Sequence, residues 1–227
     1  MQNMKELKLL FCFLLTLIFT SCLQNETTPK ISAQQSNIQM SGLKNLEIIQ
    51  RNFDELNNNF TYVNKPISPY AILQLSSGND ALPVIVSIDV EGLRNSTQYL
   101  YNIPYFKDAD GSLRINFKNF VNYEINEEVK GYFAYKHLGK LKNNLHILET
   151  FGNSGGEDVI KTILFVRCVI SEGDPSLPDK SILIHRVSEI ELGPNYAGTI
   201  KILQDENAVE IGADKFILTK QVIKFNQ

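Results

Sequence analysis

The sequence predicts a mainly β domain, an antiparallel sandwich or a barrel-like sheet, preceded by one N-terminal amphipathic helix. Three observations indicate this fold class. Apolar and polar residues alternate with period two through most of the chain after residue 60, as in strands with one buried face. The candidate strands recur roughly every 10 to 15 residues, with turn-forming residues between them. No helical periodicity separates these strands, which favours antiparallel pairing over βαβ units.

Residues 41–59 form the predicted helix. Its apolar residues recur every three or four positions, which places them on one stripe. They are Leu43, Leu46, Ile49, Phe53 and Leu56. Three asparagines at 57–59 then end the helix. We expect the stripe to pack against the sheet, and docking into a groove of a partner is the alternative.

Ten segments are predicted as strands. They are residues 70–75, 84–90, 97–106, 113–123, 129–138, 144–151, 159–170, 181–192, 199–203 and 215–225. The most apolar of them is 159–170, in which only Lys161 and Arg167 relieve one face, so we expect it at the centre of the sheet. The Asp- and Gly-containing segment 108–111 is predicted as a hairpin turn rather than a calcium loop, because a strand follows it at once.

The first 22 residues have the order of an export signal. A start containing two lysines precedes an apolar core at 9–19, and two small residues lie directly before Cys22. This stretch resembles the lipobox of bacterial lipoproteins. The resemblance implies a signal peptide at 1–21, acyl chains on Cys22 and a flexible polar tether over 22–40. A single mostly β domain would then cover 41–227.

The resemblance also implies a location. The chain would lie in a bacterial cell envelope, attached to the lipid bilayer through Cys22, and the lack of an Asp directly after Cys22 points to the outer membrane, on its periplasmic or surface face. A plain secretory signal without lipidation is the alternative interpretation. A retained membrane span would need about 18 to 20 apolar residues, and the core at 9–19 is shorter.

Composition excludes one class of partner. The chain has 22 Lys and Arg against 25 Asp and Glu, and loss of 1–21 would remove two of the first group and one of the second, leaving 20 against 24. With this mildly acidic balance and no long basic run, nucleic acid is not expected as a partner.

Cys12 lies in the leader and Cys168 in an apolar run, so we expect no disulfide and a core role for Cys168. Neither a cofactor nor a metal is expected.

The segment 152–156, with sequence GNSGG, resembles the surroundings of the nucleophilic serine in chymotrypsin-like proteases. The resemblance implies Ser154 as nucleophile, glycines shaping an oxyanion hole and a histidine far upstream. Here the first histidine, His137, lies only 17 residues before Ser154. We therefore expect a glycine-rich hairpin loop between two strands.

His137, His146 and Glu149 are the other candidates, since imidazole and carboxylate together bind metals or move protons. In a hairpin of 129–138 with 144–151, His137 would face Leu145, and His146 would point to the opposite side. Glu149 would share the face of His137 but lie roughly 13 Å along the strand. This register predicts no common site, although a one-residue slip would change the faces.

The leading hypothesis is a binding or interaction module with an envelope protein or a glycan as ligand. Tyr99, Tyr101 and Tyr105 alternate onto one face, where aromatic rings could stack on sugars, but Ile103 interrupts them and packing in the core is the favoured interpretation. The alternative is an envelope hydrolase whose site is assembled from loops, with Ser154, His137 and Glu149 as its residues.

Overall fold

The computed structural model describes residues 33–76, 86–95, 104–116, 121–122, 127–128, 131–171 and 180–225. The leader, Cys22, Tyr99 and Tyr101 therefore lie outside the described residues. The chain divides into two compact units, Met1–Leu46 and Glu47–Gln227. The second unit is mainly β, as the sequence predicts. Within the described residues, no helix combines the length and the hydropathy needed to cross a bilayer.

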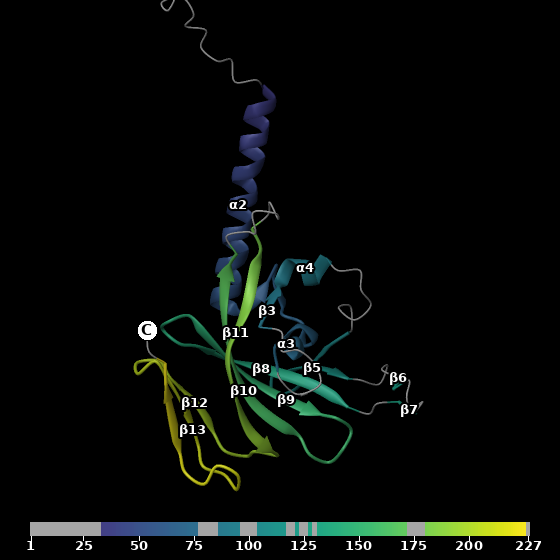
Figure 1. Cartoon of the computed structure of the whole chain (residues 1–227), viewed down its shortest axis with the longest axis vertical. Coiled ribbons are helices and arrows are strands. Elements are labelled where there is room, and N and C mark those ends of the chain that lie inside the picture. Colours follow the sequence, from purple (N-terminus) through teal and green to yellow (C-terminus); the bar gives the residue numbers. More distant parts are fainter. Residues whose placement is uncertain are drawn as a thin grey trace, which may run out of the picture. The chain divides into compact units, whose positions relative to one another are not determined.

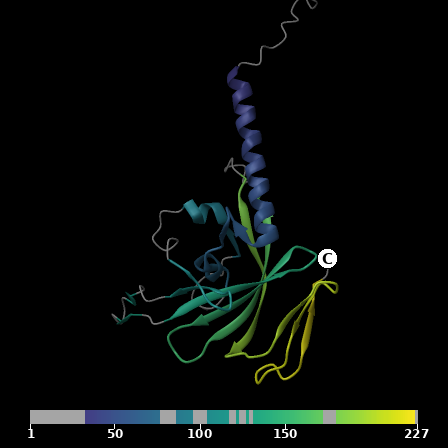
Figure 2. The same cartoon turned by 180° about the vertical axis from the view of Figure 1, so that it is seen from behind.

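A curled antiparallel sheet of seven strands forms the centre of the second unit, as Figures 1 and 2 show from opposite sides. The strand order is β3-β11-β10-β9-β8-β5-β4. The strands are β3 (Ser87–Asp89), β4 (Phe106–Lys107), β5 (Leu113–Asn116), β8 (Tyr132–Lys140), β9 (Leu145–Asn153), β10 (Ile160–Ile170) and β11 (Ile182–Pro194). A separate pair, β6 (Val121–Asn122) and β7 (Glu127–Glu128), forms its own small sheet.

The central position of the segment 159–170 is confirmed. Strand β10 pairs with β9 on one side and β11 on the other. Leu164 and Val166 belong to one hydrophobic core, while Ile163 and Phe165 belong to a second core on the opposite face. All four side chains are fully buried, because successive side chains of a strand point to opposite faces and both faces of this strand are covered.

The first core lies between one face of the sheet and the helices. It contains Leu56 from α2 (Ala33–Asn59) and Ile72 and Leu75 from α3 (Pro69–Leu75), all fully buried. The short hairpin of β1 (Thr61–Tyr62) and β2 (Lys65–Pro66) follows α2 and adds buried Tyr62. From the predicted stripe, Ile49 and Phe53 also pack against this core, whereas Leu46 remains 46% exposed.

The second core lies between the opposite face of the large sheet and a small sheet of order β12-β13-β14. Its strands are β12 (Ile200–Leu203), β13 (Ala208–Ile211) and β14 (Gln221–Lys224). Val209 and Ile211 of β13 belong to the same buried cluster as Ile147 of β9. Tyr196 is buried in this cluster and donates its hydroxyl proton to the Gly212 carbonyl over 2.8 Å.

The strand predicted at 70–75 is wrong, because this segment forms helix α3. Ser68 caps it by accepting a hydrogen bond from the Tyr70 amide over 3.3 Å, and Pro69 occupies the first turn, where its missing N–H costs nothing. Ala71, Ile72 and Leu75 are buried together on one side. Helical spacing of three and four residues, rather than alternation, therefore describes this segment.

The strand predicted at 84–90 is corrected where the structure describes it. Residues 84 and 85 lie outside the described residues, the strand covers Ser87–Asp89, and Val86 is 59% exposed instead of sharing a buried face with Ile88. The Asp89 carboxylate accepts hydrogen bonds from the amides of Glu91 and Gly92 over 3.0 and 3.1 Å. This cap begins helix α4 (Val90–Asn95), which ends the strand.

Two further predictions are corrected in part. Of the strand predicted at 215–225, only Gln221–Lys224 is a strand, and β13 was missed because its first two residues, Ala208 and Val209, are both apolar and both buried, which breaks the alternation. Most of the segment 97–106 lies outside the described residues, and only its last residue belongs to β4. The hairpin turn predicted at 108–111 is confirmed between β4 and β5, with Gly111 at a φ of +87°.

Replacement of Ile147 by Ala tests the second core. Ile147 is completely buried, so we expect the free energy of unfolding to fall by about 3 kcal/mol through lost burial and the cavity left behind. Ile160→Ala is the matched control, because Ile160 on the neighbouring strand is 39% exposed, and it should cost less than about 1 kcal/mol. Urea denaturation measures both. Equal losses would contradict a closed core on this face.

Candidate functional site

The register of the β8–β9 hairpin differs from the predicted one. His137 lies opposite Leu148 rather than Leu145, and Lys140 lies opposite His146. Between His137 and Gly139 the ladder shifts, so that Leu138 has no partner in this ladder and forms a bulge. Strand β8 also extends to Lys140, which shortens the turn. Both changes alter which side chains share a face.

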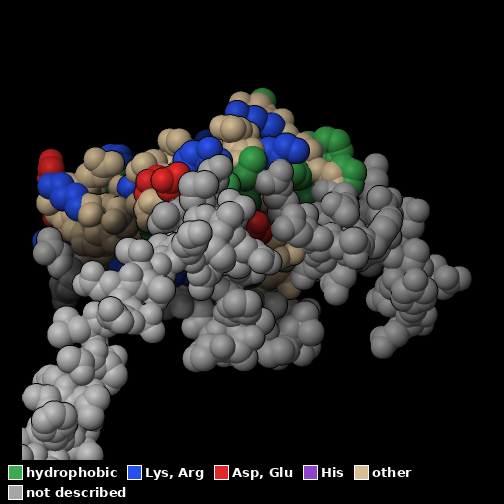
Figure 3. All heavy atoms as spheres, turned by 90° about the horizontal axis from the view of Figure 1, so that it is seen from above, with side chains coloured by type: hydrophobic (Ala, Val, Ile, Leu, Met, Phe, Trp, Pro, Cys, Tyr) green, Lys and Arg blue, Asp and Glu red, His purple; other side chains and the backbone are tan. Residues whose placement is uncertain are grey.

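As a result, the two histidines meet. The His146 Nδ1 and His137 Nε2 atoms are 3.2 Å apart, within hydrogen-bond distance. The predicted separation of His137 from His146 onto opposite faces is therefore wrong. The ring of Phe60 lies over both imidazoles, with centroids 4.9 Å from His137 and 5.1 Å from His146. Among the described residues on the face shown in Figure 3, where charged and hydrophobic side chains are intermixed, no histidine is visible.

Burial keeps both imidazoles neutral. His146 is completely buried, and burial, aided by His137 and Lys140, lowers its pKa to about 3. Burial also lowers the pKa of His137, with a smaller opposing effect from a hydrogen bond to the Gly139 backbone. The Nε2 atom of His146 is buried and has no hydrogen-bond partner among the residues that the structure describes. An uncharged imidazole pair at neutral pH follows from this environment.

The pair does not amount to a metal centre. Over the part of the chain that the structure describes, no group of three or more His, Cys, Asp or Glu side chains is arranged to hold a metal ion. Two imidazoles alone leave a structural zinc two ligands short, since such sites take four. The chemistry that the closed arrangement allows is hydrogen bonding between neutral imidazoles.

Glu149 lies on the other face of the sheet from the histidines, which corrects the prediction that it shares the face of His137. It stands opposite Lys136 and next to Leu148, whose side chain belongs to the first core. Its carboxylate is 3.8 Å from the ammonium group of Lys161 on β10. Burial raises the pKa of Glu149, against the opposing effect of Lys161 and Lys136.

Ser154 lies in the exposed loop between β9 and β10, as predicted for a glycine-rich connection. Asn153 holds this loop: its side-chain amide donates to the carbonyls of Gly156 and Asp158 over 2.9 Å each, and its oxygen accepts from the Gly155 amide over 2.7 Å. Asn153 stands opposite Tyr132. His137 is five residues farther along β8, roughly 16 Å away. Ser154, His137 and Glu149 therefore share no site.

Cys168 is a core residue, as predicted. It is 5% exposed, it forms no disulfide, and its side chain belongs to the first core. Burial raises the pKa of its thiol to about 12, with Lys140 opposing the shift. A thiol held protonated in this way is a poor nucleophile.

The most exposed large apolar side chain among the described residues lies between β13 and β14. Leu218 is 84% exposed, and Phe216 is 48% exposed. Ile217 between them packs against the second core, and the Asp214 amide donates to its carbonyl over 2.7 Å. The Asp214 carboxylate in turn accepts from the Ala197 amide over 2.7 Å. The segment 214–218, called the apolar tip below, is thus tied down at its base. Alternation predicted a strand at 215–225, so the sequence analysis did not identify this exposed apolar segment.

No protein-family model matches the chain, and neither a curated protein nor a solved structure matches it. The functional argument therefore rests on the sequence of the chain and on the contacts of its described residues.

Replacing Glu149 by Gln should stabilise the protein at pH 7. A carboxyl whose pKa is raised in the folded state holds more protons there than in the unfolded chain, so its contribution to stability falls as the pH rises through the folded pKa. The uncharged amide of Gln has no such titration, so this loss of stability at pH 7 does not occur in the variant. Glu210→Gln is the control with the opposite sign, because a hydrogen bond from Lys220 lowers the pKa of Glu210. Denaturant titrations at pH 4.5 and 7 measure both. A destabilised Glu149→Gln protein at pH 7 would contradict the burial argument.

Proposed function

We propose that the protein is a membrane-anchored envelope lipoprotein that acts as a binding module. The observation that carries the anchor is the order of the first 22 residues, with a lysine-containing start, an apolar core and small residues directly before Cys22. Acyl chains on Cys22 would hold the chain in a bilayer, and the outer membrane is the proposed one. The residues from 23 to the start of α2 would connect this anchor to the folded unit.

The apolar tip is the proposed contact surface for a partner. Leu218 protrudes into solvent while the hydrogen bonds of Asp214 and the packing of Ile217 fix the segment beneath it. A segment whose backbone is already held loses less conformational entropy on binding than a free loop, which favours the use of its exposed apolar residue as an anchor. We infer that the two sheets, packed over the second core as a β-sandwich, serve as the rigid support of this tip.

A protein is a better partner for the tip than a glycan. Sugar rings stack on open aromatic faces, and the only aromatic residue in the tip is Phe216. The Lys215 ammonium lies 4.7 Å from the centre of that ring and covers it. Leu218, an aliphatic side chain, instead suits an apolar pocket on a protein. The alternative hydrolase hypothesis gains no support here, since Ser154, His137 and Glu149 lie apart.

The anchor is tested by replacing Cys22 with Ser in the native host. The unchanged chain should incorporate a labelled fatty acid and partition into detergent, and the Cys22→Ser chain should do neither, because serine offers no thiol for acylation. Cys168→Ser is the matched control and should retain the label, since Cys168 is buried. Mass spectrometry of the mature N-terminus checks the site. An unmodified residue 22 would contradict the anchor.

The contact surface is tested with a photo-crosslinking amino acid at position 218 in living cells. We expect one discrete protein adduct from position 218 and none from position 154, which is exposed in a different loop. Adding Phe216→Asp to the position-218 chain should abolish the adduct by placing a charge in the apolar contact. Equal adducts from both positions, or none from either, would argue against the tip as a binding surface.

A further inference from the structure

Phe60 forms a tight corner where α2 ends. Its amide donates to the Leu56 carbonyl over 2.9 Å, and the next residue begins β1. Its φ of +55° lies in the left-handed region, which is unfavourable for a bulky residue. Such a conformation persists only where the surroundings hold it. The surroundings here are the imidazoles of His137 and His146, over which the Phe60 ring packs.

One placement of the protons fits the contacts of the histidine pair. The Gly139 backbone raises the pKa of His137, as an accepting carbonyl does, and Nδ1 is the atom that the contact with His146 leaves for it. In neutral His137, Nε2 is then an acceptor, so His146 Nδ1 donates to it. The remaining His146 atom, Nε2, is buried and has no partner among the described residues. Protonation of His137 at Nε2 would remove the acceptor of the hydrogen bond between the rings, and protonation of His146 at Nε2 would place a buried charged N–H where no described group accepts it.

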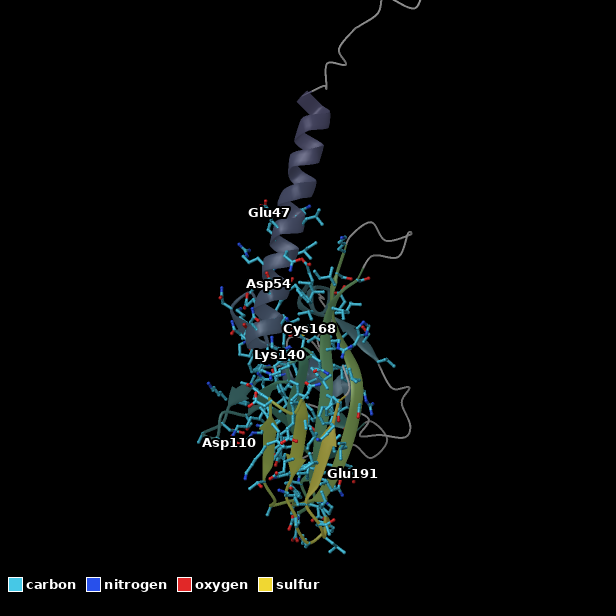
Figure 4. All side chains as sticks on the ribbon, turned by 90° about the vertical axis from the view of Figure 1, so that its left-hand side faces the viewer. Glu47, Asp54, Asp110, Lys140, Cys168 and Glu191 are labelled. Carbon is cyan, nitrogen blue, oxygen red and sulfur yellow. The ribbon has the colours of Figure 1, made fainter. Side chains whose placement is uncertain are left out.

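The groups around the pair do not favour a positive charge. From β8, the Lys140 ammonium lowers the pKa of both imidazoles. It donates to the Asn57 carbonyl at the end of α2 over 2.7 Å, and Figure 4 shows it beside that helix end, near Cys168 of β10. Burial keeps the Cys168 thiol protonated by raising its pKa, and it does the same for the Tyr135 hydroxyl, which donates to the Ile67 carbonyl. Among the described groups that shift the two histidine pKa values, none is a carboxylate.

We propose that Phe60, His137 and His146 form a pH-sensitive latch that holds the C-terminal end of α2 against the β8–β9 hairpin and opens more readily in acid. Opening means local separation of the helix end and the Phe60 corner from the hairpin, which brings both imidazoles into water. There each can take up a proton that it cannot hold in the closed cluster. The latch does not depend on lipidation of Cys22 or on the apolar tip.

The size of the effect follows from linkage. An imidazole in water has a pKa of about 6.5, whereas the closed latch depresses both values, so the open state binds more protons below about pH 6.5. The closed state is therefore fully favoured above that pH and weakened as the pH falls. For each histidine that is neutral when closed and free when open, opening becomes about 25-fold more favourable between pH 7 and pH 5.

Amide hydrogen exchange of the purified full chain at pH 7 and pH 5 tests the latch. After correction for intrinsic exchange rates, protection of the Phe60 amide should fall at least about 25-fold at pH 5. The Val166 amide, in a central strand paired on both sides, should change far less. An unchanged Phe60 amide would overturn the proposal. An equal loss at Val166 would also overturn it, because it would show global unfolding in acid.

The variant His146→Asn separates titration from packing. The asparagine amide can still donate to His137 from near the Nδ1 position, but it cannot take up a proton. We expect the fall in protection at Phe60 to shrink by about 25-fold, while the control His185→Asn, on β11 and outside the cluster, should behave like the unchanged protein. A full pH effect in His146→Asn would overturn the proposal. If that variant does not fold, the exchange of the Phe60 and Val166 amides in the unchanged chain still tests the proposal.

Discussion

Burial of β9 and β10 on both faces is the constraint on which the rest of this structure depends. Leu148 and Leu164 face the helices, while Ile147 and Phe165 face the small sheet, and all four are fully buried. Two cores of different composition thus share one pair of strands. Because each core covers one face, neither strand can slip by one residue without exchanging its entire set of buried side chains.

The same constraint accounts for the histidine pair. With Leu148 fixed toward the helices, His146 two residues earlier must point the same way. The bulge at Leu138 adjusts the end of β8 so that His137 reaches the same place. Phe60 then closes the cluster from the helix side. Polar groups thereby enter an apolar core at the point where α2 ends, and their neutrality is a condition of that packing.

The proposed roles fall on different parts of the chain. The anchor belongs to the first residues, the contact surface to the segment between β13 and β14, and the latch to the corner between α2 and β1. In the chain, α2 is the covalent connection from the residues near Cys22 to the sheet. A change in how firmly the end of α2 is held would therefore act on this connection, whereas the tip is fixed by separate hydrogen bonds to Ala197 and Ile217.

Sequence alone determined the mainly β class, the central place of 159–170 and the loop around Ser154, because alternation and turn chemistry are local properties of the chain. It failed at 70–75, which is a capped helix, and at β13, where two successive buried apolar residues, Ala208 and Val209, break the alternation. Only the tertiary structure brought His137 to His146 and moved Glu149 away from both. A bulge of one residue reverses the facing of every side chain beyond it, and the packing of both cores, rather than the residues of the hairpin, decides where that bulge lies.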